Sequence, residues 1–98
     1  MLVRIVKMTF KEEEIENFKH LFDEKKSLIR GVAGCQFLEL YQDQQNKSIF
    51  FTYSYWENDE ALQNYRHSEL FKEVWANTKV KFDAKPEAWS VNKLVSLP

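Results

Sequence analysis

Apolar residues recur along this chain with two different periods, and the changes of period divide the sequence into six elements. Runs rich in β-branched and aromatic residues predict strands, whereas apolar residues spaced three or four apart predict helices. The predicted order is strand, helix, strand, strand, helix, strand, and the second helix has a break at 66–68. The expected ranges are 2–8, 10–30, 35–42, 48–56, 59–82 and 88–97.

The start and end of the first helix each carry a sequence signal. Thr9 is expected to cap the helix with its hydroxyl, because Glu12 follows three residues later as in a capping box. Gly31 is expected to end the helix in the left-handed conformation, and 31–34 to form the turn that follows. The expected apolar stripe of this helix comprises Ile15, Phe18, Leu21, Phe22, Leu28 and Ile29.

The second half of the chain is punctuated in the same way. The polar segment 43–47 predicts a hairpin turn. Asn58 is a plausible N-cap for the second helix, and Ser68 can cap its second piece. The pair Lys85-Pro86 is expected to stop the helix. The apolar stripe expected after the break comprises Leu70, Phe71, Val74, Trp75, Thr78 and Phe82.

This element order predicts an α+β, ferredoxin-like fold (βαββαβ) over the single domain 1–98, with a four-stranded antiparallel sheet and both helices on one face. The face without helices is expected to be apolar as well. On the third strand Ile49, Phe51, Tyr53 and Tyr55 point one way, and Phe50 and Trp56 point the other. Because a large exposed apolar face is unfavourable, we expect a second copy to cover it in a two-fold homodimer.

Composition and charge exclude several classes of partner. The net charge is −1 and the basic residues are dispersed, so we expect no nucleic-acid partner. No apolar run approaches the ~18 residues of a membrane-spanning helix, and we expect no membrane partner. The one cysteine, Cys35, cannot form an intramolecular disulfide, which fits a reducing cytoplasm. We expect it to be a buried structural thiol.

One stretch of the sequence resembles a known family. Tyr55-Trp56-Glu57-Asn58, then Glu60-Ala61-Leu62, and then Tyr65, Ser68 and Phe71 are similar to the antibiotic biosynthesis monooxygenase domain. The resemblance implies a dimeric α+β barrel. The family includes cofactor-free quinone-forming monooxygenases, quinol oxidases and haem-degrading enzymes.

The chain departs from some members of that family at particular positions. Quinol-oxidising relatives tend to carry His where this chain has Tyr65, and often another at the position of Leu70. The resemblance places the haem-ligating His of haem-degrading relatives at Trp75, and an Asn of their first strand at Lys7. An indole cannot ligate iron, and Lys7 replaces a neutral amide by a cation, so haem degradation is disfavoured.

In a cofactor-free monooxygenase the substrate itself is the reductant, so the protein must supply a dry cleft, a proton acceptor and donors for the substrate anion. His67 is the candidate catalytic acid–base, because its free pKa is near ~6.5. Arg4 and Arg66 are further candidates to stabilise an anion. The candidates for the ligand pocket are Phe37, Phe51, Tyr53, Trp56, Tyr65, Phe71 and Trp75.

Each of these residues also has an ordinary structural interpretation. The aromatic residues could be packed core, His67 a capping or surface residue, and both arginines solvated. No Cys/His cluster has metal-ligand spacing and no glycine-rich phosphate loop occurs, so no cofactor or metal is expected.

Three hypotheses for function follow. The first is a cofactor-independent monooxygenase that oxidises a small phenolic or quinol-type aromatic with O2. The second is a non-catalytic dimer that binds a small ligand or acts in stress or regulation, and the third, disfavoured one is a haem protein.

Overall fold

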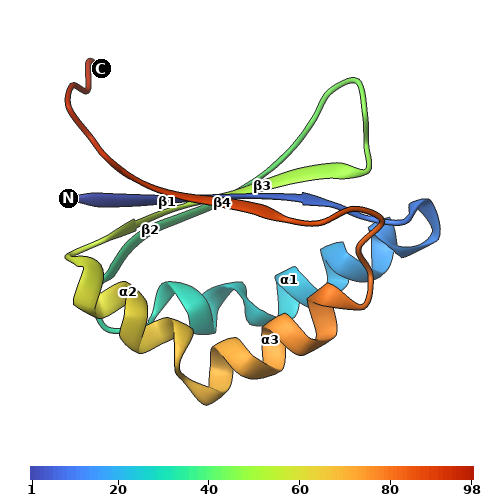
Figure 1. Cartoon of the computed structure of the whole chain (residues 1–98), viewed down its shortest axis with the longest axis horizontal. Coiled ribbons are helices and arrows are strands. Elements are labelled where there is room, and N and C mark those ends of the chain that lie inside the picture. Colours follow the sequence, from blue (N-terminus) through green and yellow to red (C-terminus); the bar gives the residue numbers. More distant parts are fainter.

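Four antiparallel strands form one sheet, and the helices lie against a single face of it (Figure 1). The computed structural model describes residues 1–98. The strand order is β2-β3-β1-β4, so β1 and β3 are central and the ferredoxin-like arrangement is confirmed. The elements are β1 (Leu2–Thr9), the 3₁₀ turn η1 (Glu12–Glu14), α1 (Ile15–Arg30), β2 (Cys35–Gln42), β3 (Ile49–Trp56), α2 (Asp59–Arg66), α3 (Glu69–Lys79) and β4 (Glu87–Asn92).

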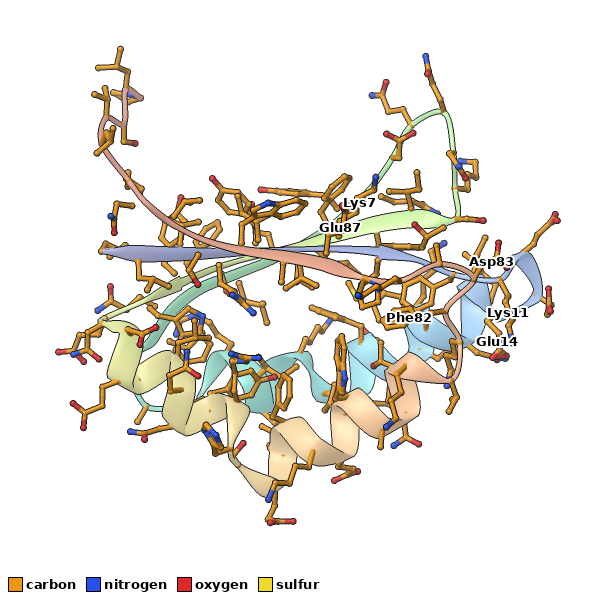
Figure 2. All side chains as sticks on the ribbon, in the orientation of Figure 1. Lys7, Lys11, Glu14, Phe82, Asp83 and Glu87 are labelled. Carbon is orange, nitrogen blue, oxygen red and sulfur yellow. The ribbon has the colours of Figure 1, made fainter.

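The first helix begins later than predicted, and the prediction that Thr9 caps it is wrong. β1 runs through Thr9, whose carbonyl accepts a hydrogen bond of 2.8 Å from the backbone N–H of Asp83. The next residue, Phe10, is only 1% exposed. Burying its ring keeps the backbone extended beyond the predicted start, and η1 then leads into α1. Figure 2 shows Asp83 beside this end of β1.

The turn between α1 and β2 depends on Gly34 and not on Gly31. Gly31 has a φ of −81°, so the prediction of a left-handed cap there is wrong. Its N–H instead donates to the carbonyl of Ser27 at 3.0 Å. Gly34 has a φ of +88°, and a Cβ at this position would lie 2.4 Å from the Cβ of Ala61. The start of α2 therefore packs directly on this glycine.

Both predicted caps around the broken second helix are confirmed. Asn58 Oδ1 accepts a hydrogen bond of 2.9 Å from the N–H of Ala61, and Ser68 Oγ accepts one of 3.1 Å from the N–H of Phe71. Ser68 Oγ also donates to the carbonyl of Tyr65 at 2.6 Å. The hydroxyl of Ser68 thus joins the last turn of α2 to the first turn of α3.

Two boundaries and the burial of one residue differ from the predicted pattern. α3 ends at Lys79, well before the predicted stop, and Phe82 lies beyond it, in an isolated bridge to Phe10. These two rings pack against each other in a tilted arrangement, with centroids 5.3 Å apart, and this contact holds Phe82 against the end of β1 (Figure 2). β4 ends at Asn92 instead of continuing to 97. Leu28 is 56% exposed, so it does not belong to the buried stripe of α1.

The core between helices and sheet has two centres. The first is formed by Met8, Phe10, Phe18 and Phe50, and the rings of Phe10 and Phe18 stack 4.1 Å apart. The second is formed by Cys35, Trp56 and Leu62. Burial of each large side chain stabilises the fold by roughly 1.5–3 kcal/mol. Between these two centres the helices and the sheet are less completely filled, and the candidate site lies there.

The sheet face turned away from the helices carries apolar and aromatic side chains and no covering element. Tyr53, for example, is paired with Ile5 on β1, which is paired with Trp89 on β4. Trp89 is 44% exposed and Val91 40% exposed. The β2–β3 turn and the segment after β4 both rise on this side of the sheet (Figure 1). The residues on the two faces agree with the predicted division. We call this surface the open face.

Candidate functional site

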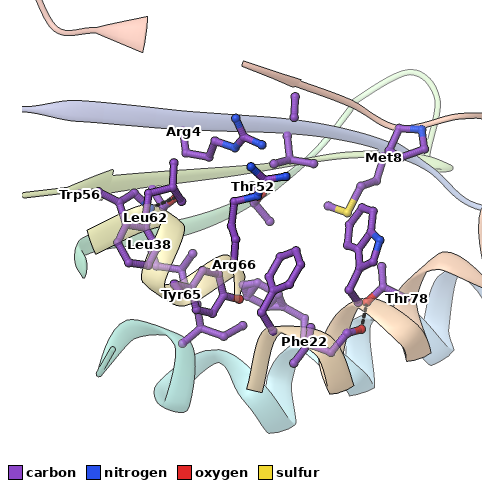
Figure 3. Close-up of a pocket in the computed structure, with 18 of the residues that line it drawn as sticks. Arg4, Met8, Phe22, Leu38, Thr52, Trp56, Leu62, Tyr65, Arg66 and Thr78 are labelled. Carbon is purple, nitrogen blue, oxygen red and sulfur yellow. Dashed lines mark hydrogen bonds between the residues drawn. The ribbon is translucent and has the colours of Figure 1, made fainter. Parts of the chain in front are cut away.

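A cavity of about 300 Å³ lies between the helices and the helix-facing side of the sheet (Figure 3). Every strand of the sheet and all three α-helices contribute to its wall. Hydrophobic side chains make up 13 of the 19 lining residues, so the interior is predominantly apolar, as is usual for pockets that bind small organic molecules. Its volume is at the low end of such pockets. The aromatic side chains in the wall are Phe18, Phe22, Trp56, Tyr65, Phe71 and Trp75.

Four of these rings form a continuous row. Trp56 stacks on Tyr65 at 5.2 Å, Tyr65 meets Phe71 edge to face at 5.2 Å, and Phe71 stacks on Trp75 at 5.8 Å. The row crosses the α2–α3 break, where Ser68 holds Tyr65 and Phe71 in register. Ring pairs at these separations attract one another. The wall therefore offers a fixed aromatic surface on which a planar ligand can stack.

Few polar groups face the cavity, and some of them are already paired within the wall. The indole N–H of Trp56 donates to Ser54 Oγ at 3.0 Å, and Thr78 Oγ1 donates to the carbonyl of Val74 at 2.7 Å. Donors that remain available are those of Arg4 and Arg66, which make one side-chain hydrogen bond each, and the hydroxyls of Thr52 and Tyr65. No Asp, Glu, His or Lys side chain lines the cavity.

Two guanidinium groups line the same part of the cavity. Arg4 projects from β1, and Arg66 extends from the end of α2 toward it (Figure 3). Arg4 Nη1 donates to Ser90 Oγ at 3.0 Å, and Arg66 Nη1 to Gln63 Oε1 at 3.3 Å. Burial, and secondly the charge of Arg66, lower the pKa of Arg4, while Asp59 acts in the opposite direction. The two cations are therefore close enough to repel one another.

Tyr65 is the third polar group of interest in the wall. Burial, and to a smaller extent the neighbouring Cys35, raise the pKa of its hydroxyl to about 12. The hydroxyl therefore stays protonated over the physiological range and can donate a hydrogen bond to a ligand. Burial likewise raises the pKa of the Cys35 thiol, and the thiol is 6% exposed, as expected of a structural cysteine.

The structure divides the seven predicted pocket residues between the two faces of the sheet. Trp56, Tyr65, Phe71 and Trp75 line the cavity. The other three, Phe37, Phe51 and Tyr53, belong to the open face. The alternation along β2 and β3 puts these three on the side opposite Trp56, so they cannot wall the same cavity as the other four.

His67, the predicted acid–base residue, does not line the cavity. It is exposed at the end of α2, where its Nδ1 lies 2.7 Å from the carbonyl of Gln63. Its neighbour Arg66 lines the cavity, whereas the imidazole turns back along the helix toward Gln63. The catalytic role of His67 stays a prediction.

Several residues of the wall were not singled out in the sequence. Met8, Leu38 and Val74 line the cavity; the first two lie within predicted strands and Val74 within the predicted stripe of the second helix. Phe22 and Phe18 come from α1, which carries no family motif. The alternation of side chains along β1 could have identified some of them. Arg4, Val6 and Met8 are two residues apart, so they lie on the same face of the sheet, which is the one the helices cover.

The fold and cavity define a class of protein, a small ferredoxin-like α+β domain with an aromatic chamber under its helices. The model of the antibiotic biosynthesis monooxygenase family matches residues 1–77. The chain belongs to this family.

Solved structures of similar fold cover nearly the whole chain. An antibiotic biosynthesis monooxygenase is 20% identical with a TM-score of 0.90, covering 97% of this chain and 100% of that one. A conserved protein from Methanosarcina mazei Go1 is 23% identical with a TM-score of 0.88, covering 95% and 93%. Rv0793 from Mycobacterium tuberculosis is 14% identical with a TM-score of 0.89, covering 99% and 98%. At these identities the likeness establishes the fold alone.

None of the curated proteins is significantly similar in sequence to this chain. No helix combines the length and the apolar character needed to cross a membrane.

Proposed function

We propose that this protein is a cofactor-independent monooxygenase that oxidises a small phenolic or quinol-type aromatic compound with O2. The observation that carries the proposal is the apolar cavity with its row of stacked rings, found in a member of a family that includes such enzymes. A planar substrate would lie against the row formed by Trp56, Tyr65, Phe71 and Trp75. The apolar wall would exclude water from the reacting ring.

The reaction balances without a cofactor. The ionised phenol gives one electron to O2, and the resulting pair of radicals combines to form a C–O bond at the ring carbon para to the hydroxyl. After protonation, the O–O bond and the C–H bond of that ring carbon break, so that water leaves and a carbonyl remains; the reacting carbon must therefore carry a hydrogen. One oxygen atom enters the quinone product, the other leaves as water, and four electrons pass from the substrate to O2.

The test is protein-dependent O2 uptake with a panel of hydroxynaphthoquinols and anthrones, corrected for autoxidation with heat-denatured protein. With ¹⁸O2, mass spectrometry is expected to show one labelled oxygen in each quinone. Val74→Trp fills the cavity and is expected to abolish uptake, because Val74 lines it. Val80→Trp is the matched control, since Val80 is 65% exposed, and is expected to retain the wild-type rate.

Two results would contradict the proposal. One is uptake no faster than with denatured protein for every compound in the panel. The other is equal rates for Val74→Trp and Val80→Trp, which would place the reaction elsewhere. Saturable binding of the same compounds without uptake would instead favour the non-catalytic, ligand-binding hypothesis.

We also propose that the protein acts as a two-fold homodimer, with the open face as the interface. Support comes from the apolar side chains on that face and from the segment after β4, where Leu94 is 89% and Leu97 85% exposed. Two copies packed face to face would bury both surfaces, and the helices with their cavities would remain on the outside.

A further inference from the structure

Arg4 and Arg66 form no salt bridge within the chain, although the Asp59 carboxylate acts on Arg4 from beyond salt-bridge distance. The ion pairs in the structure involve lysines only. Arg4 and Arg66 each make one side-chain hydrogen bond, to the neutral groups of Ser90 and Gln63. A guanidinium has five N–H donors, so most donors of both residues remain available.

The position of the pair is unusual for solvated cations. Both side chains line a predominantly apolar cavity, and Figure 3 shows them converging above the aromatic side chains. Arg66 is exposed and also lines the cavity, which places it at an opening, while Arg4 is half-buried further in. Two like charges brought together in a partly desolvated site repel each other unless an anion lies between them.

We propose that Arg4 and Arg66 together bind an anionic oxygen, a carboxylate or an ionised hydroxyl, attached directly to the aromatic ring of the ligand. The ring enters the aromatic chamber and the charged oxygen remains at the arginine pair. This assignment rests on the proposed function for its catalytic consequence, and it specifies the substrate class as aromatic acids and acidic phenols. Neutral aromatic compounds of the same shape bind less well.

The arginine pair also replaces a general base. No side chain lining the cavity ordinarily titrates near neutral pH, because Asp, Glu and His are absent from the wall. The substrate therefore loses its proton to water, and the nearby positive charges stabilise the anion by lowering the pKa of the bound hydroxyl. The pH profile of the reaction then follows the substrate hydroxyl and not an imidazole.

The binding test uses two redox-inert probes of the same shape, 2-naphthoate and the neutral 2-naphthamide. Binding is followed by calorimetry and by quenching of the tryptophan fluorescence, since Trp56 and Trp75 line the cavity. Naphthoate is expected to bind about tenfold to hundredfold tighter than naphthamide, the usual effect of hydrogen bonds to a charged group. Raising the salt concentration is expected to reduce this difference.

The variants assign this selectivity to the pair. Arg66→Met removes the exposed member and is expected to weaken naphthoate binding by about tenfold with little change for naphthamide. Arg66→Lys keeps the charge and is expected to be intermediate. Lys72→Met is the control, because Lys72 is an exposed cation outside the cavity, and should leave both affinities unchanged. Arg4→Met repeats the comparison for the half-buried member of the pair, once its melting temperature has shown that the variant folds.

Equal affinity for the two probes, or failure of both to bind at millimolar concentration, would overturn the assignment. So would an equal loss for both probes in Arg66→Met. If naphthoate selectivity holds but no compound supports O2 uptake, the arginine site stands and the proposed oxidation fails. If uptake occurs at the same rate in Arg66→Met, or the rate falls in His67→Ala and its pH profile moves, the oxidation stands and the role of the arginine pair in it fails.

Discussion

At the scale of single residues, Tyr65 connects the stability of the fold to the chemistry of the site. Its ring lies between Trp56 and Phe71, and its hydroxyl has a pKa raised to about 12, first by burial. Only the neutral form is accommodated in the folded chain without cost. Because burial removes water from the hydroxyl, Tyr65 keeps its proton as a hydrogen-bond donor, and its ionisation would destabilise the folded chain.

This linkage predicts a loss of stability at high pH. The unfolded tyrosine ionises from about pH 10, whereas folded Tyr65 ionises only near pH 12. The contribution of Tyr65 is therefore fully present below about pH 10 and is lost as the pH rises toward 12, by about 2 kcal/mol. In urea unfolding across this range, Tyr65→Phe is expected to show a correspondingly smaller decline than the wild type.

Tyr41→Phe is the comparison for this experiment. The pKa of Tyr41 is also raised to about 12, mainly by its hydrogen bond with the Glu39 carboxylate. Tyr41 is 46% exposed, so solvent screening weakens its effect on folding. If Tyr65→Phe and Tyr41→Phe reduce the loss of unfolding free energy at high pH equally, burial of Tyr65 is not the cause of that loss.

Residue identity alone did not reveal which aromatic side chains share the cavity. Phe51 and Tyr53 on β3 are as aromatic as Trp56, yet they face the other side of the sheet because side chains alternate along a strand. The sequence identifies this alternation but not which face the helices cover. Arg4 and Arg66 are 62 positions apart in the sequence, so only the tertiary fold brings their side chains together in the cavity wall.

At the scale of elements, the turn before β2 requires glycine at position 34, because there is no room there for a side chain. Gly34 has a φ of +88°, and its added Cβ would lie 2.4 Å from Ala61 Cβ. Gly34→Ala is expected to destabilise the fold by about 2 kcal/mol or more, because the left-handed backbone costs about 1–2 kcal/mol and the clash displaces α2. Urea unfolding of the purified variant measures this change.

Gly31→Ala is the matched control for that substitution. Gly31 has a right-handed φ of −81°, and its added Cβ would lie 3.3 Å from the Ser27 carbonyl oxygen, a tight contact without backbone strain. Its effect is expected to stay within about 1 kcal/mol of wild type. Equal destabilisation by the two variants would contradict the role assigned to Gly34.

The break between α2 and α3 allows stability and binding to be separated. Ser68→Ala removes an N-cap and is expected to cost about 1 kcal/mol. It also releases Tyr65 and Phe71, which Ser68 Oγ joins, so naphthoate binding should weaken by roughly threefold, or about 0.6 kcal/mol. Asn58→Ala removes the other cap, at the far end of α2, and should cost similar stability without weakening binding. Calorimetric titration and urea unfolding of both variants would detect any departure from this pattern.

The sequence predicted the elements well where local chemistry governs them and poorly where tertiary packing does. The caps at Asn58 and Ser68 are local and were correct. The cap expected at Thr9 failed because burial of the Phe10 ring holds the chain extended. The helix expected to reach Phe82 ends earlier because that ring packs against Phe10, a contact that no periodicity in either segment specifies.

At the scale of the whole molecule, the sheet has one covered and one open face. The rings of Phe37 and Tyr55 stack 4.5 Å apart on the open face, and Lys93 Nζ lies 4.0 Å from the centroid of the Tyr55 ring. The polar component of this face includes Lys7 and Glu87, whose charged groups are 3.8 Å apart (Figure 2). The face is therefore mostly aromatic and apolar, with a small charged border, which is the composition expected of an interface.

The dimer proposal predicts that sedimentation equilibrium at micromolar concentration gives twice the 11.8 kDa mass of one chain. Tyr53→Lys places a charge at the centre of the open face and is expected to yield monomers, because an unpaired charge in an apolar interface is strongly unfavourable. Leu28→Lys is the matched control, since Leu28 is 56% exposed on α1 and lies on the helical side. Removal of residues 93–98 is expected to weaken association without unfolding the sheet, because those residues lie outside β4. A wild-type mass of one chain, or a Tyr53→Lys variant that dimerises as tightly as Leu28→Lys, would show that another surface, or none, carries the association.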